Sequence, residues 1–174
     1  MIRTVLACAL ILISSASIAE TPYAGLQARQ IKSLLEQQVA DLKAARGMGM
    51  ALAAELNGYP GPAHVLELAA RLDLTPDQRT KVQTLFDAMK AEAIPLGSKL
   101  LEREADLDKQ FAMHTVTSES LKATTAQVAM TQGSLRETHL KYHLLTVAVL
   151  TPDQMHRYAE SRGYGSQLMH HHHN

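Results

Sequence analysis

The stretch Leu-Thr-Pro-Asp-Gln at positions 74–78 occurs a second time, residue for residue, at positions 150–154. Each copy has the residues that begin an α-helix. The Thr hydroxyl accepts a hydrogen bond from a free N–H of the first turn, Pro needs no partner at the first helical position, and Asp lies near the positive end of the helix dipole. Gln, three residues after Thr, can bond back to the N–H of Thr and close a capping box. The repeat therefore predicts two helices with the same N-cap, Thr75 in one and Thr151 in the other.

The segment between the two copies is predicted to form two long helices. The first follows the first copy, and Pro95 with Gly97 after it predicts a kink. A turn at 114–118 precedes the second helix, at about 119–149, in which an apolar residue recurs every seventh position. A connection this short makes the two helices an antiparallel hairpin. The apolar stripe of the first helix is Val82, Leu85, Phe86, Met89, Leu96, Leu100, Leu107 and Phe111; that of the second is Leu121, Val128, Leu135, Tyr142 and Val149.

Shorter helices flank this hairpin. On its N-terminal side, apolar residues from Ile31 to Leu42 share one helix face, a dense turn signal follows at 57–62, and a short helix is expected at 63–72. The second copy of the repeat begins a last short helix that Gly163 ends. The predicted fold class is all-α: a long, kinked, antiparallel helical hairpin with short flanking helices.

The N-terminus has the pattern of a secretory signal. Arg3 provides the positive start, Val5 to Ile13 is apolar but too short to span a bilayer, and Ser17-Ile18-Ala19 fits a cleavage site. Cys8, the only cysteine, lies inside this leader; a lipoprotein anchor there is the alternative, although the apolar run before it is very short. We therefore predict a periplasmic protein without thiols. The expected division is a signal peptide at 1–19, an N-terminal helix and turn-rich segment at 20–62, the hairpin domain at 63–164 and a tail at 165–174.

Composition limits the functions that the chain can have. It carries 17 basic and 17 acidic residues, so no net charge favours nucleic acid. The sequence has no nucleophile elbow, phosphate loop, metalloprotease motif or cysteine pair, so we do not expect an enzyme. No segment after the leader is long and apolar enough to be transmembrane.

The paired repeat behind a signal peptide resembles the Spy/CpxP group of periplasmic stress proteins, which are named for paired LTxxQ motifs. The resemblance covers about residues 65–158, and related heavy-metal-resistance proteins share the same helical plan. The matching residues, read here as helix caps, are Leu74, Thr75, Gln78, Leu150, Thr151 and Gln154.

The resemblance implies a curved homodimer of helical hairpins. In that family the concave face binds unfolded or partly folded envelope proteins without ATP, or docks on the periplasmic domain of a sensor kinase. Met89, Met113 and Met130 are the candidates for client contact, because flexible Met side chains adapt to varied apolar surfaces; the alternative is that they fill the core. Two departures are the absence of a positive net charge and the additional segment at 20–62, of which residues 26–42 are expected to pack either on the hairpin or on a second subunit.

A second hypothesis is a metal-binding sensor or resistance protein. His139 and His143 are four residues apart, which places both imidazoles on one helix face, but a metal site needs a third ligand; a solvated pair is the alternative. Met48 and Met50 lie in a Gly-Met-Gly-Met segment near His64, and thioether with imidazole suits copper(I), whereas core filling is again the alternative.

The tail carries four consecutive histidines, His170 to His173. Such a run binds divalent metals in any flexible segment, and it is either native or the remnant of an added tag. The chaperone hypothesis requires no cofactor, and the metal hypothesis implies copper or zinc.

Overall fold

The computed structural model describes residues 23–164. Within that range the chain is all-α, with no strand, as predicted. The helices are η1 (Leu26–Ala28, a 3₁₀ turn), α1 (Glu36–Lys43), α2 (Leu52–Glu55), α3 (Pro62–Glu67), α4 (Pro76–Ala112), α5 (Ser118–Val147) and α6 (Pro152–Ser161). The predicted leader with Cys8 and the histidines of the tail lie outside the described residues, and the predicted dimer stays a prediction.

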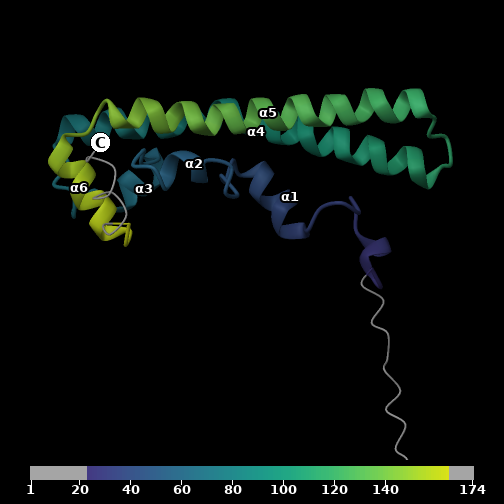
Figure 1. The fold of residues 1–174 in the computed structure, drawn as a ribbon, viewed down its shortest axis with the longest axis horizontal. Coiled ribbons are helices and arrows are strands. Elements are labelled where there is room, and N and C mark those ends of the chain that lie inside the picture. The colour runs from purple at the N-terminus through teal and green to yellow at the C-terminus, as the bar shows by residue number, and fades with distance from the viewer. Residues whose placement is uncertain (1–22, 165–174) are drawn as a thin grey trace, which may run out of the picture.

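The long helices α4 and α5 lie side by side along the length of the molecule and form the expected hairpin (Figure 1). Residues 113–117 connect them, and Thr117 caps α5 by accepting a bond from the backbone N–H of Ser120 at 3.1 Å. α4 is a single helix of 37 residues that continues through Pro95. Pro95 therefore does not divide the helix, although it removes one hydrogen-bond donor from it.

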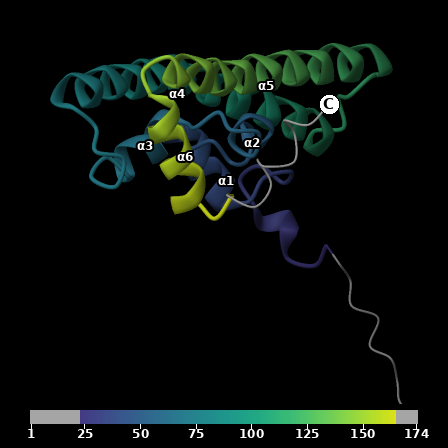
Figure 2. The same ribbon diagram turned by 60° about the vertical axis from the view of Figure 1, so that its left-hand side comes forward.

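The N-terminal segment packs on the hairpin. Figures 1 and 2 show α1, α2 and α3 together on one side of the α4–α5 pair. The contact between α1 and α4 is close at Gly97, where a Cβ atom would lie 2.3 Å from the backbone oxygen of Leu42. Gly97 is thus needed for helix contact. Of the two positions left open for this segment, contact with the hairpin is the one observed.

The N-terminal helix is shorter than its apolar pattern suggested. Ile31 and Leu34 precede α1, which begins only at Glu36. Leu35 takes the N-cap position, where its N–H donates to the Gln38 side chain at 2.8 Å but its own side chain offers no acceptor. Ile31 is nevertheless buried against the hairpin, because apolar burial does not require a regular helix.

Two apolar clusters stabilise the fold. One lies midway along the hairpin, under α1, and the other lies where α6 folds back (Figure 1). The buried members of the first are Ile31, Leu42, Ala45, Ala93, Leu100, Leu101 and Leu135, and those of the second are Val65, Leu72, Val82 and Tyr158. We call the end with α3 and α6 the base, and the opposite end, residues 109–130 around the α4–α5 connection, the tip.

The last helix behaves as the repeat predicted. α6 begins at Pro152, and its C-terminal turn reaches Gly163, which has a positive φ of 76°. Glycine adopts this left-handed conformation without the steric penalty of a Cβ. Among the described residues, no helix has the length and apolar character needed to cross a membrane.

Candidate functional site

Both copies of the repeat form the predicted capping box. In the first copy the N–H of Gln78 donates to Thr75 Oγ1 at 3.2 Å, and the N–H of Thr75 donates to Gln78 Oε1 at 3.1 Å. In the second copy the corresponding distances between Thr151 and Gln154 are 3.3 Å and 3.0 Å. The caps therefore satisfy backbone donors that would otherwise have no partner in the first helical turn.

The two copies also meet in space, which sequence reasoning did not predict. Gln78 Nε2 donates to Gln154 Oε1 at 2.8 Å, and Gln154 Nε2 donates to Gln78 Oε1 at 2.9 Å. Each amide reaches further: Gln78 to the carbonyl of Val149 at 2.9 Å, and Gln154 to that of Leu72 at 3.2 Å. This glutamine pair joins the start of α4 to the start of α6 across the base. The two copies of the repeat therefore begin two helices and also form one tertiary contact between them.

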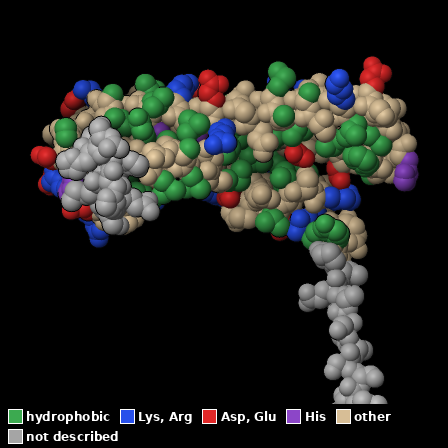
Figure 3. Space-filling view, viewed as in Figure 1, with side chains coloured by type: hydrophobic (Ala, Val, Ile, Leu, Met, Phe, Trp, Pro, Cys, Tyr) green, Lys and Arg blue, Asp and Glu red, His purple; other side chains and the backbone are tan. Residues whose placement is uncertain are grey.

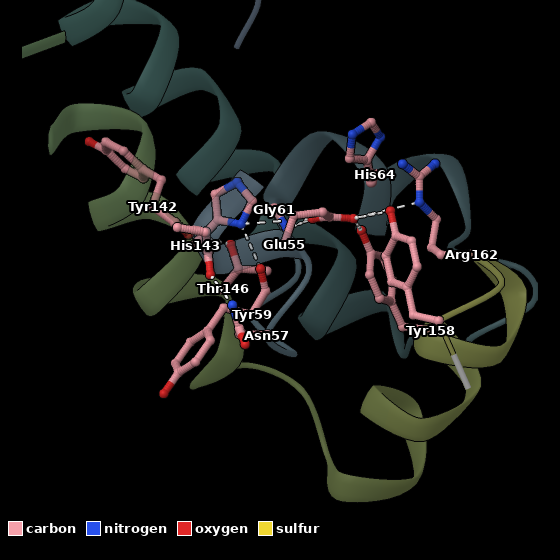
Figure 4. A network of polar contacts seen from close by, with 12 residues as sticks. Glu55, Asn57, Tyr59, Gly61, His64, Tyr142, His143, Thr146, Tyr158 and Arg162 are labelled. Atoms are coloured by element: carbon pink, nitrogen blue, oxygen red, sulfur yellow. Dashed lines mark hydrogen bonds and ion pairs between the residues drawn. The ribbon is translucent and has the colours of Figure 1, made fainter. Parts of the chain in front are cut away.

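A buried carboxylate, Glu55 of α2, organises the polar interior of the base (Figure 4). It accepts a hydrogen bond from the Tyr158 hydroxyl at 2.5 Å and lies 3.6 Å from Arg162 Nε, both from the α6 end of the chain. Burial, followed by the hydrogen bond to Glu55, raises the pKa of the Tyr158 phenol, so this hydroxyl stays protonated as a donor. Sequence analysis missed Glu55, and its only signal was an acid in an otherwise apolar run.

A cavity of about 510 Å³ lies beside this network, between the α1–α3 segment, α4 and α5. Four of the five residues that the sequence singled out as metal candidates line it: Met48, His64, His139 and His143. The fifth, Met50, packs against the mid-hairpin apolar cluster instead. The cavity wall also includes Met89 of α4.

His139 is the most unusual side chain of this cavity. It is 3% exposed, and its Nε2 atom is buried without a hydrogen-bond partner. Burial, and to a smaller extent the neighbouring His143, lowers the pKa of His139, which favours the neutral imidazole. Its Nδ1 faces the Gly-Met-Gly-Met segment, where a Cβ added to Gly47 would lie 3.9 Å away.

His143, one turn along α5, is fixed by the loop between α2 and α3. Its Nδ1 donates to the carbonyl of Tyr59 at 2.6 Å, and it lies 3.8 Å from Glu55 Oε2 (Figure 4). The ring passes against Gly61, where a Cβ would lie 2.7 Å from Nε2. The two histidines are therefore a buried pair in a packed setting, and the alternative of a solvated pair does not describe them.

Two acidic side chains of α4 pair with residues other than the two histidines. Glu92 accepts bonds from Lys141 and from the Tyr142 hydroxyl, and Glu104 accepts one from Ser33. Over residues 23–164, no three His, Cys, Asp or Glu side chains are placed to hold a metal ion. His64, at the cavity wall, has its Nδ1 3.0 Å from a Glu67 carboxylate oxygen.

The three methionines considered for client contact divide into two kinds. Met113 and Met130 lie at the tip and are 59% and 73% exposed. Met89 is buried and lines the cavity. Met89 is therefore not part of the exposed surface, and only Met113 and Met130 are available there.

Taken together, the fold and the base define an all-α hairpin protein whose two capped helix starts join through their glutamines. A family model described as LTXXQ motif family protein matches residues 63–161, more than half of the chain. The chain belongs to this family, the family of Spy/CpxP-like periplasmic proteins. Neither the search of curated proteins nor that of solved structures gives a match.

Proposed function

We propose that the protein is an ATP-independent periplasmic chaperone that holds unfolded or partly folded envelope proteins at the tip of its hairpin. The observation that supports the proposal is the group of large apolar side chains exposed there. Figure 3 shows hydrophobic side chains on the surface at that end of the molecule. The exposed residues at the tip are Phe111, Met113, Leu121 and Met130.

The exposure and flexibility of these side chains suit contact with an unfolded chain. Exposed apolar surface attracts the apolar segments that an unfolded chain displays, because contact removes both from water. Met is unbranched and polarizable, so Met113 and Met130 can adapt to clients of different shape. Met130 stands on α5 and Met113 directly after the end of α4, on an open surface that suits varied partners more than one specific ligand.

The proposed location follows from the N-terminal pattern and the family. A signal at 1–19 would deliver the chain to the periplasm, where ATP does not drive folding. The family membership supports this assignment, since the group is known for periplasmic proteins.

The test is suppression of aggregation of a chemically denatured client on dilution, without nucleotide. The protein should keep the client soluble at stoichiometric amounts. Replacing Met113 and Met130 together with Ser should remove most of this activity. Leu144→Ser is the matched control, because Leu144 is an equally exposed apolar side chain on α5 but lies toward the base.

Two results would contradict the proposal. One is no suppression by the unaltered protein at a molar excess. The other is equal loss of suppression in Leu144→Ser and in the Met113/Met130 variant, which would show that the tip has no special role. Circular dichroism of each variant establishes that the hairpin is still folded.

A further inference from the structure

We propose that the cavity beside the base binds a single copper(I) ion through His139 Nε2 and the thioether sulfurs of Met48 and Met89. This site is separate from the tip, and it does not depend on the proposed chaperone activity.

The buried Nε2 nitrogen of His139 indicates a ligand at this site. A buried polar atom without a partner costs about 1–3 kcal/mol, and such atoms are rare in folded proteins. Among residues 23–164 His139 Nε2 has no such partner, and the His139 side chain lines a cavity with space for a ligand. A metal ion that accepts the imidazole lone pair would remove the cost.

The donor atoms at the cavity favour one metal over another. Zinc sites in proteins are built from three or four Cys, His and carboxylate ligands, and no such group exists among the described residues. The cavity wall also carries the thioethers of Met48 and Met89. Soft thioethers combined with imidazole favour copper(I) over zinc. The structure thus favours copper among the two metals that the sequence left open.

Met48 has an uncommon backbone conformation at the cavity wall. It lies between Gly47 and Gly49 with a positive φ of 44°, an uncommon conformation for a residue with a side chain. Met48 is 40% exposed while it lines the cavity, so its side chain is reached both by solvent and by a ligand in the cavity. Met89 lies on the buried side. A ligand can therefore enter past Met48 toward His139 and Met89.

His143 supports the site without being one of the three ligands. Its Nδ1 donates to the Tyr59 carbonyl, which ties the second imidazole of the helix to the loop that covers the cavity. Positioning contacts of this kind around metal ligands strongly influence affinity. His64 also lines the cavity, with its Nδ1 3.0 Å from a Glu67 carboxylate oxygen, and it is not one of the three proposed ligands.

The experiment is a competition for copper(I) between the full-length protein and the chelator bicinchoninate, under anaerobic reducing conditions. Cys8 of the leader and all four tail histidines, His170 to His173, are replaced by Ala, so that neither the thiol nor the tail can contribute. We expect the protein to withdraw a single copper ion from the chelator. Met48→Leu and Met89→Leu should each weaken binding roughly tenfold or more, and His139→Leu should abolish it.

The chain provides a matched control. Met50→Leu changes the same residue type in the same Gly-Met-Gly-Met segment, but Met50 packs into the apolar cluster away from the cavity. It should leave copper affinity unchanged. X-ray absorption of the copper-loaded protein should show sulfur neighbours together with nitrogen, and this measurement needs no variant.

The proposal is overturned by any of three results: copper binding that disappears with the tail histidines, full affinity in both Met48→Leu and Met89→Leu, or an absorption spectrum without sulfur neighbours. Thermal unfolding of each variant separates a lost ligand from a lost fold. An unaltered aggregation assay in Met48→Leu would show that this site and the tip are independent.

Discussion

The base and the tip of the hairpin are built from the same two helices but are stabilised in different ways. At the base, α3, α6 and the turns around them cover α4 and α5, and buried polar groups bond across segments far apart in sequence. At the tip, two helices pair without a third layer, and large apolar side chains remain exposed (Figure 3). Buried polar contacts between segments far apart in sequence lie at the base, whereas exposed large apolar side chains occur along the whole molecule and at the tip are carried by the hairpin alone.

This difference predicts that substitutions at the base change stability and substitutions at the tip change binding. Stability depends on burial and on satisfied polar groups, both of which the base supplies. The tip can lose apolar side chains at little cost because water already reaches them. Substitutions at the base should therefore lower the free energy of unfolding more than substitutions at the tip do.

The largest effect is expected from Glu55→Ala. It leaves the buried Tyr158 hydroxyl without its acceptor and the Arg162 guanidinium without its ion-pair partner. Removing one member of a buried charged network costs about 3 kcal/mol or more. Chemical denaturation measures the loss, and Glu67→Ala is the control, since the Glu67 carboxylate is exposed and pairs only with His64. A similar small effect from both variants would show that the buried network does not stabilise the base.

The glutamine pair should give the next largest effect. Gln154→Ala leaves the carbonyl of Leu72 without its donor and removes both hydrogen bonds to the Gln78 amide, together with the capping-box bond from the N–H of Thr151; we expect this to cost about 2 kcal/mol. A double-mutant cycle with Gln78→Ala should show a coupling energy of about 1 kcal/mol, because each residue bonds to the other. Additive effects would mean that the two copies of the repeat act only as separate helix starts.

How much of this base the sequence predicted depends on the range of each contact. The capping boxes of Thr75 and Thr151 were predictable, because every bond in them lies within four residues. The glutamine pair was not, because its members are 76 residues apart and either Gln was already explained by its own cap. Local rules describe how a helix begins and do not indicate which other helix start it meets.

The grouping of residues around the cavity could not be predicted from local sequence rules either, although the burial of one of them could. The candidate residues His139, His143, Met48 and His64 were identified by type and spacing, but only the packing of three segments places them around one space. One signal was available: His139 lies four residues after Leu135, on the face of α5 that the apolar stripe marks as buried. A histidine on a helix face marked by apolar residues is expected to be buried, so this position already argued against a solvated pair.

His139 itself gives the third prediction. In the presence of a copper chelator, His139→Leu should raise the free energy of unfolding by about 1 kcal/mol, because an apolar side chain of similar size replaces a buried nitrogen without a partner. Most substitutions of buried residues destabilise, so a gain is informative. Denaturation with and without chelator measures it. A loss of stability would indicate that Nε2 has a partner, such as a bound water, in solution.

An effect of similar size but opposite sign is expected from the loss of one cap alone. Thr75→Ala removes the acceptor for the N–H of Gln78 and should cost about 1 kcal/mol. Thr75→Ser retains the hydroxyl and should recover most of the loss. If Thr75→Ala leaves stability unchanged but abolishes client holding, the repeat has a direct function that its role as a helix cap does not explain.

The smallest effect on stability, and the sharpest test of the comparison, lies at the tip. Phe111→Ser removes an exposed aromatic side chain at the end of α4 and should change the free energy of unfolding by no more than about 0.5 kcal/mol. The same substitution should clearly reduce suppression of client aggregation, because it removes apolar contact surface. Thermal unfolding and the aggregation assay are measured on the same preparation. If Phe111→Ser instead lowers stability as much as Gln154→Ala does, the tip side chains are structural, and the functional division between the two ends of the hairpin is wrong.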